Sequence, residues 1–197
     1  YNYHFFKSFK YRTNLTHLMQ NNIIKQAELA KEASLKIATL PTKVKNKALI
    51  GIANSLKLNS KQLLDVNKKD IEEATKNKLK GVLLKRLVID EHKIEEMVEE
   101  LKTVAKLEDP VGKVLSQIEL DKNLMLYQVT CPIGVIGAIF EARPDAIVQI
   151  SALCLKSGNA VILKGGSEAK NSNRFLVKII SKAAGKNGIP KGTVQLV

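Results

Sequence analysis

The sequence has no uninterrupted run of about 18 apolar residues, the length that a helix needs to cross a lipid bilayer. A helical membrane span is therefore excluded, and we expect no membrane partner. Apolar residues still make up 45% of the chain and charged residues 26%, which is typical of a globular domain with a substantial core.

Cysteine is scarce: Cys131 and Cys154 are the two examples. Both fall in segments whose apolar composition predicts burial, and neither belongs to a CxxC pair. This pattern argues against a disulfide framework and against a zinc site. The histidines His4, His17 and His92 are too dispersed to support another metal site. We therefore expect a reducing, cytoplasmic setting and no bound metal.

Acidic residues are few relative to basic ones: the chain has 32 Lys and Arg and 19 Asp and Glu, which gives a formal net charge of +13. A balance of this size is typical of proteins that bind nucleic acids. Yet basic residues alternate with acidic ones, as in Lys68–Glu73, and aromatic residues accompany them only at the extreme N-terminus. We interpret most of the charge as solvated lysine and expect no nucleic-acid partner. A basic RNA- or DNA-binding module stays open as an alternative.

Residues 1–18 differ in composition from the rest, because they hold six of the nine aromatic residues and no acidic residue. They lack the apolar core of a secretory signal and the Ser and Ala content of a mitochondrial presequence. Met19 stands directly before the first helical pattern. We expect residues 1–18 to be a disordered leader or a non-native extension, with a genuine N-terminal extension as the alternative.

Residues 19–112 show apolar residues at helical spacing almost throughout. One stripe runs from Ile23 to Ala38 and ends before Pro41, a second runs from Val44 to Leu56 and a third from Leu63 to Ala74. Asp90 is expected to cap a further helix that continues to about residue 105.

Residues 113–131 alternate sufficiently to predict two strands joined through Asp121-Lys122-Asn123. A two-stranded ribbon is marginal by itself, so this hairpin needs another surface to pack against.

Residues 132–197 predict a βαβα unit and therefore an α/β fold with parallel strands. Ile133–Phe140, with Gly134 and Gly137 inside it, is expected to be a buried strand, and Pro144 begins a helix. A second strand at Ala160–Leu163 leads through a glycine turn into another helix, and a third strand begins near Thr193.

Two turns of this unit, Glu141–Arg143 and Lys164–Glu168, follow strands and are expected at the carboxyl edge of the sheet, where ligands bind. The sequence has no GxxxxGK[ST] and no GxGxxG after a strand, so no standard nucleotide motif is present. A lysine beside two glycines at a helix start favours an anionic or hydroxyl-rich ligand. An ordinary strand-to-helix turn without a ligand remains the alternative.

Several segments carry a resemblance to a known family: KLEDPVGKV, PIGVIGAIFEARPDA and CLKSGNAVILKGGSEA, together with Lys45–Leu49 and Asn67–Asp70. They resemble the γ-glutamyl phosphate reductases, also called glutamate-5-semialdehyde dehydrogenases, of the aldehyde dehydrogenase superfamily. The resemblance runs from about Gln20 to Val197.

The resemblance implies an aldehyde dehydrogenase-like fold. Residues 19–112 would be the helical part of a Rossmann-like cofactor-binding domain, and residues 132–197 would be its βαβα portion. Residues 113–131 would protrude as an arm that contacts a second subunit, which implies a homo-oligomer. The implied reaction reduces L-glutamyl 5-phosphate with NADPH in proline biosynthesis.

The resemblance also implies roles for single residues. Lys164 matches the lysine that contacts the adenosine ribose, and the remaining cofactor-binding positions are Gly165, Gly166, Ser167 and Glu168. The carboxylate of Glu168 near the ribose would favour NAD, whereas Lys164 would favour NADP. These two residues point to different cofactors, and the preference of the family for NADPH decides between them.

Arg143 stands where the superfamily has an asparagine that polarises the substrate carbonyl. An arginine could instead bind the phosphate of an acyl phosphate at two points. A surface residue at a helix start is the alternative.

The family's nucleophilic cysteine would lie beyond Val197, in a catalytic domain that this sequence lacks. Neither Cys131 nor Cys154 has the exposed, electropositive setting that a reactive thiol needs. We therefore expect no catalytic residue here and an N-terminal fragment that is inactive alone. A non-catalytic fragment with only a partial nucleotide site stays open as a further alternative.

Overall fold

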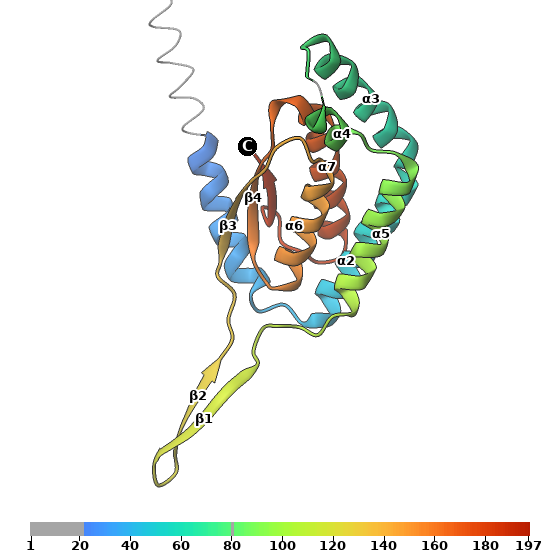
Figure 1. The fold of residues 1–197 in the computed structure, drawn as a ribbon. Coiled ribbons are helices and arrows are strands. Elements are labelled where there is room, and N and C mark those ends of the chain that lie inside the picture. The colour runs from blue at the N-terminus through green and yellow to red at the C-terminus, as the bar shows by residue number, and fades with distance from the viewer. Residues whose placement is uncertain (1–21, 80) are drawn as a thin grey trace, which may run out of the picture.

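The structure, a computed structural model, describes residues 22–79 and 81–197 (Figure 1). The expectations for residues 1–18 lie outside the described residues. After a helix over residues 22–37, the elements follow in the order α2 (Thr42–Leu58), α3 (Ser60–Lys76), α4 (Val82–Leu87), α5 (Glu91–Lys106), β1 (Val114–Asp121), β2 (Leu124–Val129), β3 (Val135–Ile139), α6 (Asp145–Lys156), β4 (Ala160–Lys164), the 3-10 helix η1 (Ser167–Ala169), α7 (Lys170–Lys186) and β5 (Val194–Leu196).

The helices form where the apolar spacing predicts them. In α2 the buried apolar side chains recur every three to four residues, so one stripe of the helix is covered. Asp90 caps α5 as expected, because its carboxylate accepts a hydrogen bond of 2.7 Å from the backbone N–H of Lys93. Within the described residues, no helix combines the length and the apolar composition needed to cross a membrane.

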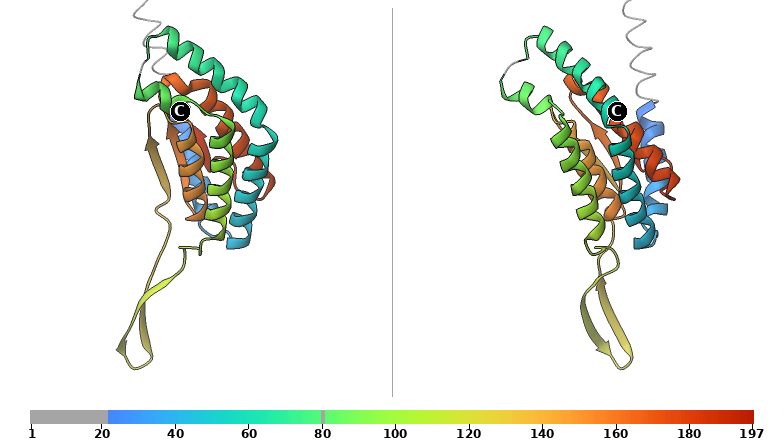
Figure 2. Two further views of the ribbon diagram at one scale, coloured as in Figure 1. Left: turned by 45° about the vertical axis from the view of Figure 1, so that its right-hand side comes forward. Right: turned by 90° about the vertical axis from the view of Figure 1, so that its right-hand side faces the viewer.

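β3, β4 and β5 form a parallel sheet with β4 in the middle. Val161 of β4 pairs with Ile136 on one side and with Val194 on the other. Because crossovers between parallel strands are right-handed, successive strands place α6 and α7 on the same face of the sheet, and α2 and α5 cover these two helices in turn. The main core lies between these four helices and β4 (Figure 2). The expected α/β architecture is confirmed.

The expectation of a buried strand at 133–140 is wrong. β3 is shorter, and Ile133 and Ile139 are 83% and 85% exposed. In the described part of the chain β3 pairs only with β4, so its second edge is uncovered and an apolar run is not buried there. Gly134 precedes the strand, with a φ of 116°, and only Gly137 lies inside it. Cys131, also expected to be buried, is exposed because it lies in the link between β2 and β3.

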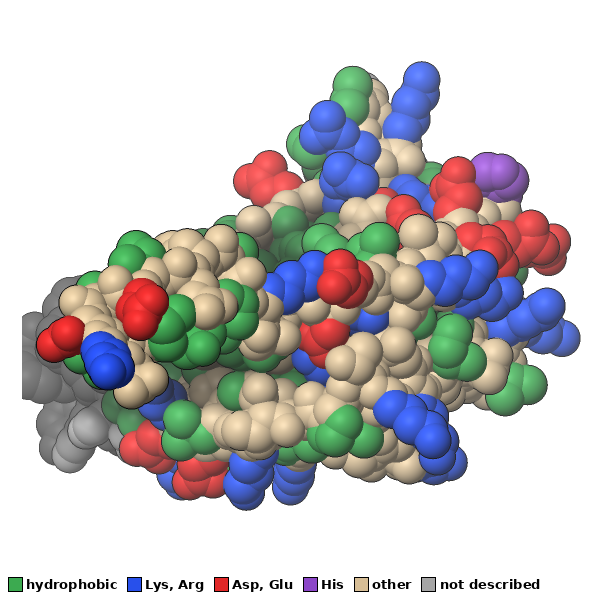
Figure 3. Space-filling model, turned by 90° about the horizontal axis from the view of Figure 1, so that it is seen from below, with side chains coloured by type: hydrophobic (Ala, Val, Ile, Leu, Met, Phe, Trp, Pro, Cys, Tyr) green, Lys and Arg blue, Asp and Glu red, His purple; other side chains and the backbone are tan. Residues whose placement is uncertain are grey.

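β1 and β2 form the expected antiparallel hairpin, which projects away from the helices and the sheet (Figures 1 and 2). Every residue of β1 is exposed, and only Met125 of β2 is partly covered. Figure 3, a view from the hairpin end, shows apolar side chains along this arm. The hairpin therefore has no core of its own.

The root of the hairpin is attached to the helices by buried charges. Lys45 is 1% exposed, and its ammonium lies 2.5 Å from the carboxylate of Asp109, which also accepts a hydrogen bond of 2.7 Å from Thr42. Burial by itself would raise the pKa of Asp109, but the hydrogen bonds from Lys45 and Thr42 lower it overall. Lys156, also buried, donates to the side chain of Asn46 at 2.6 Å.

The N-terminus of α7 is held by α3. The residue before α7, Ala169, offers no side-chain cap, and Asp70 of α3 takes this role. The carboxylate of Asp70, 1% exposed, accepts hydrogen bonds from the backbone N–H groups of Asn171 at 3.1 Å and of Ser172 at 2.7 Å. It also accepts one from the Asn171 side chain at 2.8 Å. A negative charge in this position satisfies helix donors and complements the helix dipole.

We predict that Asp70→Ala lowers the free energy of unfolding by about 3 kcal/mol, because two buried N–H groups lose a charged acceptor. Asp70→Asn, which keeps one acceptor oxygen, should lose less. Urea unfolding measures the difference, and Asp65→Ala is the matched control because Asp65 is an exposed carboxylate on the same helix. Equal losses at positions 65 and 70 would contradict the capping role.

Candidate functional site

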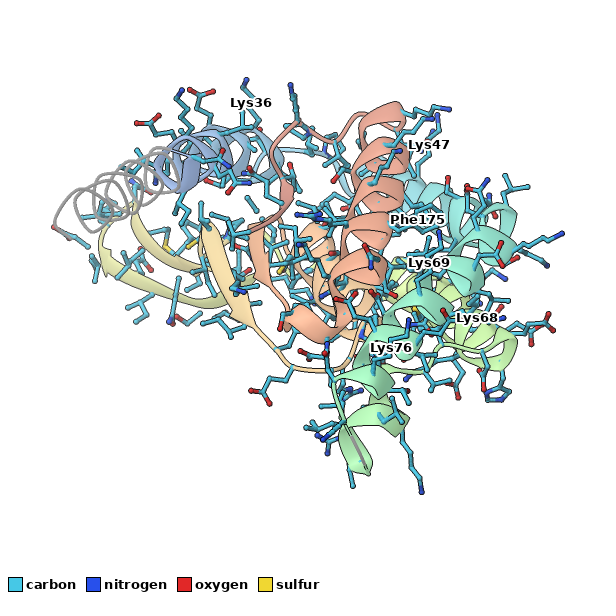
Figure 4. All side chains as sticks on the ribbon, turned by 90° about the horizontal axis from the view of Figure 1, so that it is seen from above. Lys36, Lys47, Lys68, Lys69, Lys76 and Phe175 are labelled. Atoms are coloured by element: carbon cyan, nitrogen blue, oxygen red, sulfur yellow. The ribbon has the colours of Figure 1, made fainter. Side chains whose placement is uncertain are left out.

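The candidate site lies at the carboxyl edge of the parallel sheet. β3 ends at Ile139 and β4 at Lys164, and the two residues are register partners. The turns that follow these strands, residues 140–144 and 165–169, therefore begin side by side. Figure 4 looks down on this end of the molecule. The sequence predicted that both turns would share the ligand-bearing edge, and the structure brings them together.

A hydrogen bond joins the two turns. The backbone N–H of Ala142 donates to the carboxylate of Glu168 at 2.5 Å. Ala142 is 1% exposed and has a φ of 40°, a region that residues with a side chain rarely occupy. Such a conformation costs on the order of 1–3 kcal/mol and persists only where the surroundings fix it. Glu168 supplies part of that constraint.

An open groove of about 740 Å³ lies beside the second turn, between α7, the end of β5 and the start of the 22–37 helix. Its charged lining residues are all cationic: Lys164, Lys170, Arg174 and Lys178. The last three recur every four residues and so form one stripe along α7. Glu168 is the only member of the Lys164–Glu168 turn that does not line the groove. The groove therefore suits a ligand with negative charge.

A shallower hollow of about 270 Å³ adjoins the groove where α7 meets α3. It shares Arg174 and Lys178 with the groove and adds Lys69 of α3. Figure 4 shows Lys69 close to Phe175 of α7. The positive surface therefore continues from α7 onto α3.

Lys164 is exposed, and its ammonium makes only a long hydrogen bond of 3.3 Å, to the carbonyl of Gly165. No carboxylate among the described residues forms an ion pair with it. Its charge is therefore available to a ligand in the groove.

The two glycines that follow have a packing role. A Cβ at Gly165 would overlap the side-chain amide of Asn173, and a Cβ at Gly166 would overlap the carboxylate of Glu168. Asn173 is 2% exposed and lines the groove, and its side-chain oxygen has no hydrogen-bond partner among the described residues. Glycine at both positions lets the side chains of Asn173 and Glu168 approach the backbone closely, and a larger residue would displace these side chains.

Arg143 lies half exposed beside the first turn. Its guanidinium is 3.3 Å from the carboxylate of Asp145, the first residue of α6. Asp145 is nearly buried and lies 3.6 Å from the ammonium of Lys93 on α5. Two cations thus share one carboxylate, and the Arg143 side chain stays half exposed to solvent.

The sequence predictions did not identify Asn67, Asp70 or Asn173. In α3 the buried residues are Leu63, Asn67, Asp70 and Ala74, so two polar residues fall on the apolar stripe. That helical spacing was the signal that could have found them. Asn67 accepts a hydrogen bond from the N–H of Ile89 and donates to Ser172, so it links α3 to α7.

A sequence profile of the aldehyde dehydrogenase family matches residues 11–197. The chain belongs to the aldehyde dehydrogenase family. Within it, the chain is 54% identical over 165 residues to a γ-glutamyl phosphate reductase of Ruminiclostridium cellulolyticum, covering 84% of this chain and 38% of that relative.

Two solved γ-glutamyl phosphate reductases share the fold. The Thermotoga maritima structure superposes with a TM-score of 0.86 at 37% identity, covering 88% of this chain and 42% of that one. The Saccharomyces cerevisiae structure superposes with a TM-score of 0.84 at 42% identity, covering 88% and 45%. The chain therefore spans about two fifths of the length of the curated relatives it matches.

The cysteines of this family member lie away from the carboxyl edge. Cys131 precedes β3, and Cys154 lies in the last turn of α6, at the end of the helix that leads into β4. Burial raises the pKa of the Cys154 thiol to about 11. Cys154 is therefore protonated near neutral pH. Within the described residues, no group of three His, Cys, Asp or Glu side chains could hold a metal ion.

We predict that a thiol reagent at pH 8 labels Cys131 in the folded chain and leaves Cys154 unmodified. Cys131 is exposed, whereas Cys154 is buried and forms thiolate only as the pH approaches about 11. Mass spectrometry of the labelled peptides measures the result, and unfolding in guanidinium should expose both thiols. Rapid labelling of Cys154 before unfolding would contradict this prediction.

Proposed function

We propose that the chain supplies the cofactor groove and a substrate-facing loop of a cytoplasmic, NADPH-dependent γ-glutamyl phosphate reductase. The reaction reduces L-glutamyl 5-phosphate to L-glutamate 5-semialdehyde and releases phosphate, a step of proline biosynthesis. Membership of the aldehyde dehydrogenase family and the identity to proteins named γ-glutamyl phosphate reductase support this proposal.

The cationic groove is the main structural support for NADPH as the cofactor. Lys164, Lys170, Arg174 and Lys178 line it, no Asp or Glu of residues 22–79 and 81–197 does so, and Glu168 is directed toward Ala142. The 2′-phosphate distinguishes NADPH from NADH, and a carboxylate beside it would oppose binding. This lining therefore fits NADPH better than NADH. Gly165, Gly166 and Ser167 also line the groove and would hold the adenosine ribose.

NADPH supplies the hydride when it is bound. The chain's own residues bind and orient the reactants. Lys164 pairs with the 2′-phosphate of the cofactor, and Arg143 binds the phosphate of the acyl phosphate from the neighbouring turn. Arg143 is half exposed and makes one ion pair of 3.3 Å with Asp145, so part of its guanidinium is free to bind the substrate phosphate.

We predict that Lys164→Ala in the complete gene product raises the KM for NADPH by about 10- to 150-fold, the equivalent of a charged contact worth about 1.5–3 kcal/mol. The KM for NADH should change far less, because NADH has no 2′-phosphate. The value of kcat should stay nearly constant, because the contact is equally strong in the ground state and the transition state. Steady-state kinetics with both cofactors measures these constants.

Lys47→Ala is the control for a general loss of positive charge, since Lys47 is exposed on α2 and does not line the groove. Equal losses for NADPH and NADH would remove the 2′-phosphate assignment. A collapse of kcat with unchanged KM values would place Lys164 in the chemical step.

We also propose that the β1–β2 hairpin joins two copies of the protein. Ile118 and Leu126 are directly opposite across the hairpin, and Leu124 lies on the same face two residues before Leu126. Each is more than 50% exposed. An exposed apolar face on a ribbon without its own core is typical of an interaction surface.

We predict that Leu126→Glu lowers the mass measured by light scattering to that of a single copy, because it places a charge in the apolar face. Gln117→Glu, a substitution on the opposite face of the hairpin, should leave the mass of the oligomer unchanged. A single-copy mass for the unsubstituted protein, or equal effects of the two substitutions, would contradict the proposal.

A further inference from the structure

Glu168 has a different environment from its neighbours in the Lys164–Glu168 turn. Lys164, Gly165, Gly166 and Ser167 line the cationic groove, whereas Glu168 does not. Its carboxylate lies at the other turn of the sheet edge and accepts the hydrogen bond from Ala142. A residue that contacts the ribose has to face the groove, so this orientation requires another role for Glu168.

The orientation of Glu168 is built into the turn. Gly166 has no Cβ, and a Cβ there would overlap the Glu168 carboxylate. The 3-10 helix Ser167–Ala169 carries Glu168, and the next residues begin α7, which Asp70 holds in place. The carboxylate is thus directed back over Gly166 toward the first turn.

The backbone at Ala142, which donates the hydrogen bond to Glu168, is also held in a fixed conformation. Ala142 is buried and has a positive φ, so its N–H is directed by a conformation that the chain does not adopt without support. A carboxylate acceptor makes a stronger hydrogen bond than a neutral one. Arg143 follows Ala142 directly, so the direction in which its side chain leaves the backbone depends on this bond.

We propose that Glu168 is a positioning residue, which holds the Ala142 turn so that Arg143 faces the substrate and which links the cofactor turn to the substrate turn. This inference rests on the proposed reductase function. Glu168 then acts on the acyl phosphate through Arg143 and contributes little to the binding of NADPH.

The kinetic test compares Glu168→Ala with Glu168→Gln in the complete gene product. Glu168→Ala removes the acceptor and should raise the KM for L-glutamyl 5-phosphate by about tenfold, the effect of one lost charged hydrogen bond. The KM for NADPH should change less than twofold. Glu168→Gln retains an acceptor oxygen and should restore most of the loss, and Glu95→Ala, an exposed carboxylate of α5, is the matched control.

A ribose contact predicts the opposite pattern, in which both substitutions raise the KM for NADPH and leave the KM for the acyl phosphate unchanged. That pattern would overturn the positioning role. If the unsubstituted protein does not reduce L-glutamyl 5-phosphate with NADPH, the proposed function fails, and the next measurement still tests the bond.

Hydrogen exchange tests the bond without any activity. Deuterium uptake by a peptide that contains Ala142 should be at least tenfold faster in Glu168→Ala than in the unsubstituted chain, and nearly unchanged in Glu168→Gln. A peptide from α2 reports whether the fold is intact. Unchanged uptake at Ala142 in Glu168→Ala, with the fold intact, would overturn the inference.

Discussion

The attachment of α7 to α3 through Asp70 is the interaction on which the candidate site depends. Only five residues separate the end of β4 from the start of α7, so the position of α7 determines the path of the turn between them. The turn itself offers no side-chain cap, and of the two donors at the helix N-terminus that of Ser172 is buried and that of Asn171 is partly buried. The carboxylate from α3 satisfies them, and Asn67, three residues before Asp70 on α3, donates a hydrogen bond to Ser172 of α7. The groove cations Lys170, Arg174 and Lys178 all lie on the helix that is held in this way.

The segments that carry the family resemblance meet in two places rather than one. KGGSEA and FEARPDA meet at the carboxyl edge of the sheet, through Glu168 and Ala142. KNKAL and LEDPVGKV meet at the opposite end through Lys45 and Asp109, and Lys156 of CLKSGN lies beside Asn46. The second meeting point contains no candidate ligand groove and attaches the hairpin to the helices. The family-like sequence thus forms the edge with the candidate groove at one end and the base of a projecting arm at the other.

Periodicity alone predicted most of the fold. The helices, the hairpin, the parallel strands and the edge at which two turns meet all follow from apolar spacing and turn residues. The exposure of β3 could not be predicted, because a short apolar run has the same composition at the edge of a sheet as in its middle. Lys45 falls on the apolar stripe of α2, so helical spacing could have indicated its burial, but the partners of Lys45 and Lys156 are distant in the sequence and could not be predicted. The candidate site shows the same difference between features set by local sequence and features that depend on distant contacts. Lys164, Gly165, Gly166 and Ser167 were placed together by local sequence, whereas the direction of Glu168 depends on a contact with Ala142, 26 residues earlier.

The four-residue spacing of Lys170, Arg174 and Lys178 has a thermodynamic consequence. Like charges one helical turn apart repel each other, so α7 is less stable as an isolated helix than its composition suggests. An anion in the groove relieves this repulsion, and part of its binding free energy therefore appears as stabilisation of the fold. Added salt screens the same repulsion and also competes with the anion. Added salt therefore reduces the repulsion within α7 and would at the same time weaken the binding of an anion in the groove.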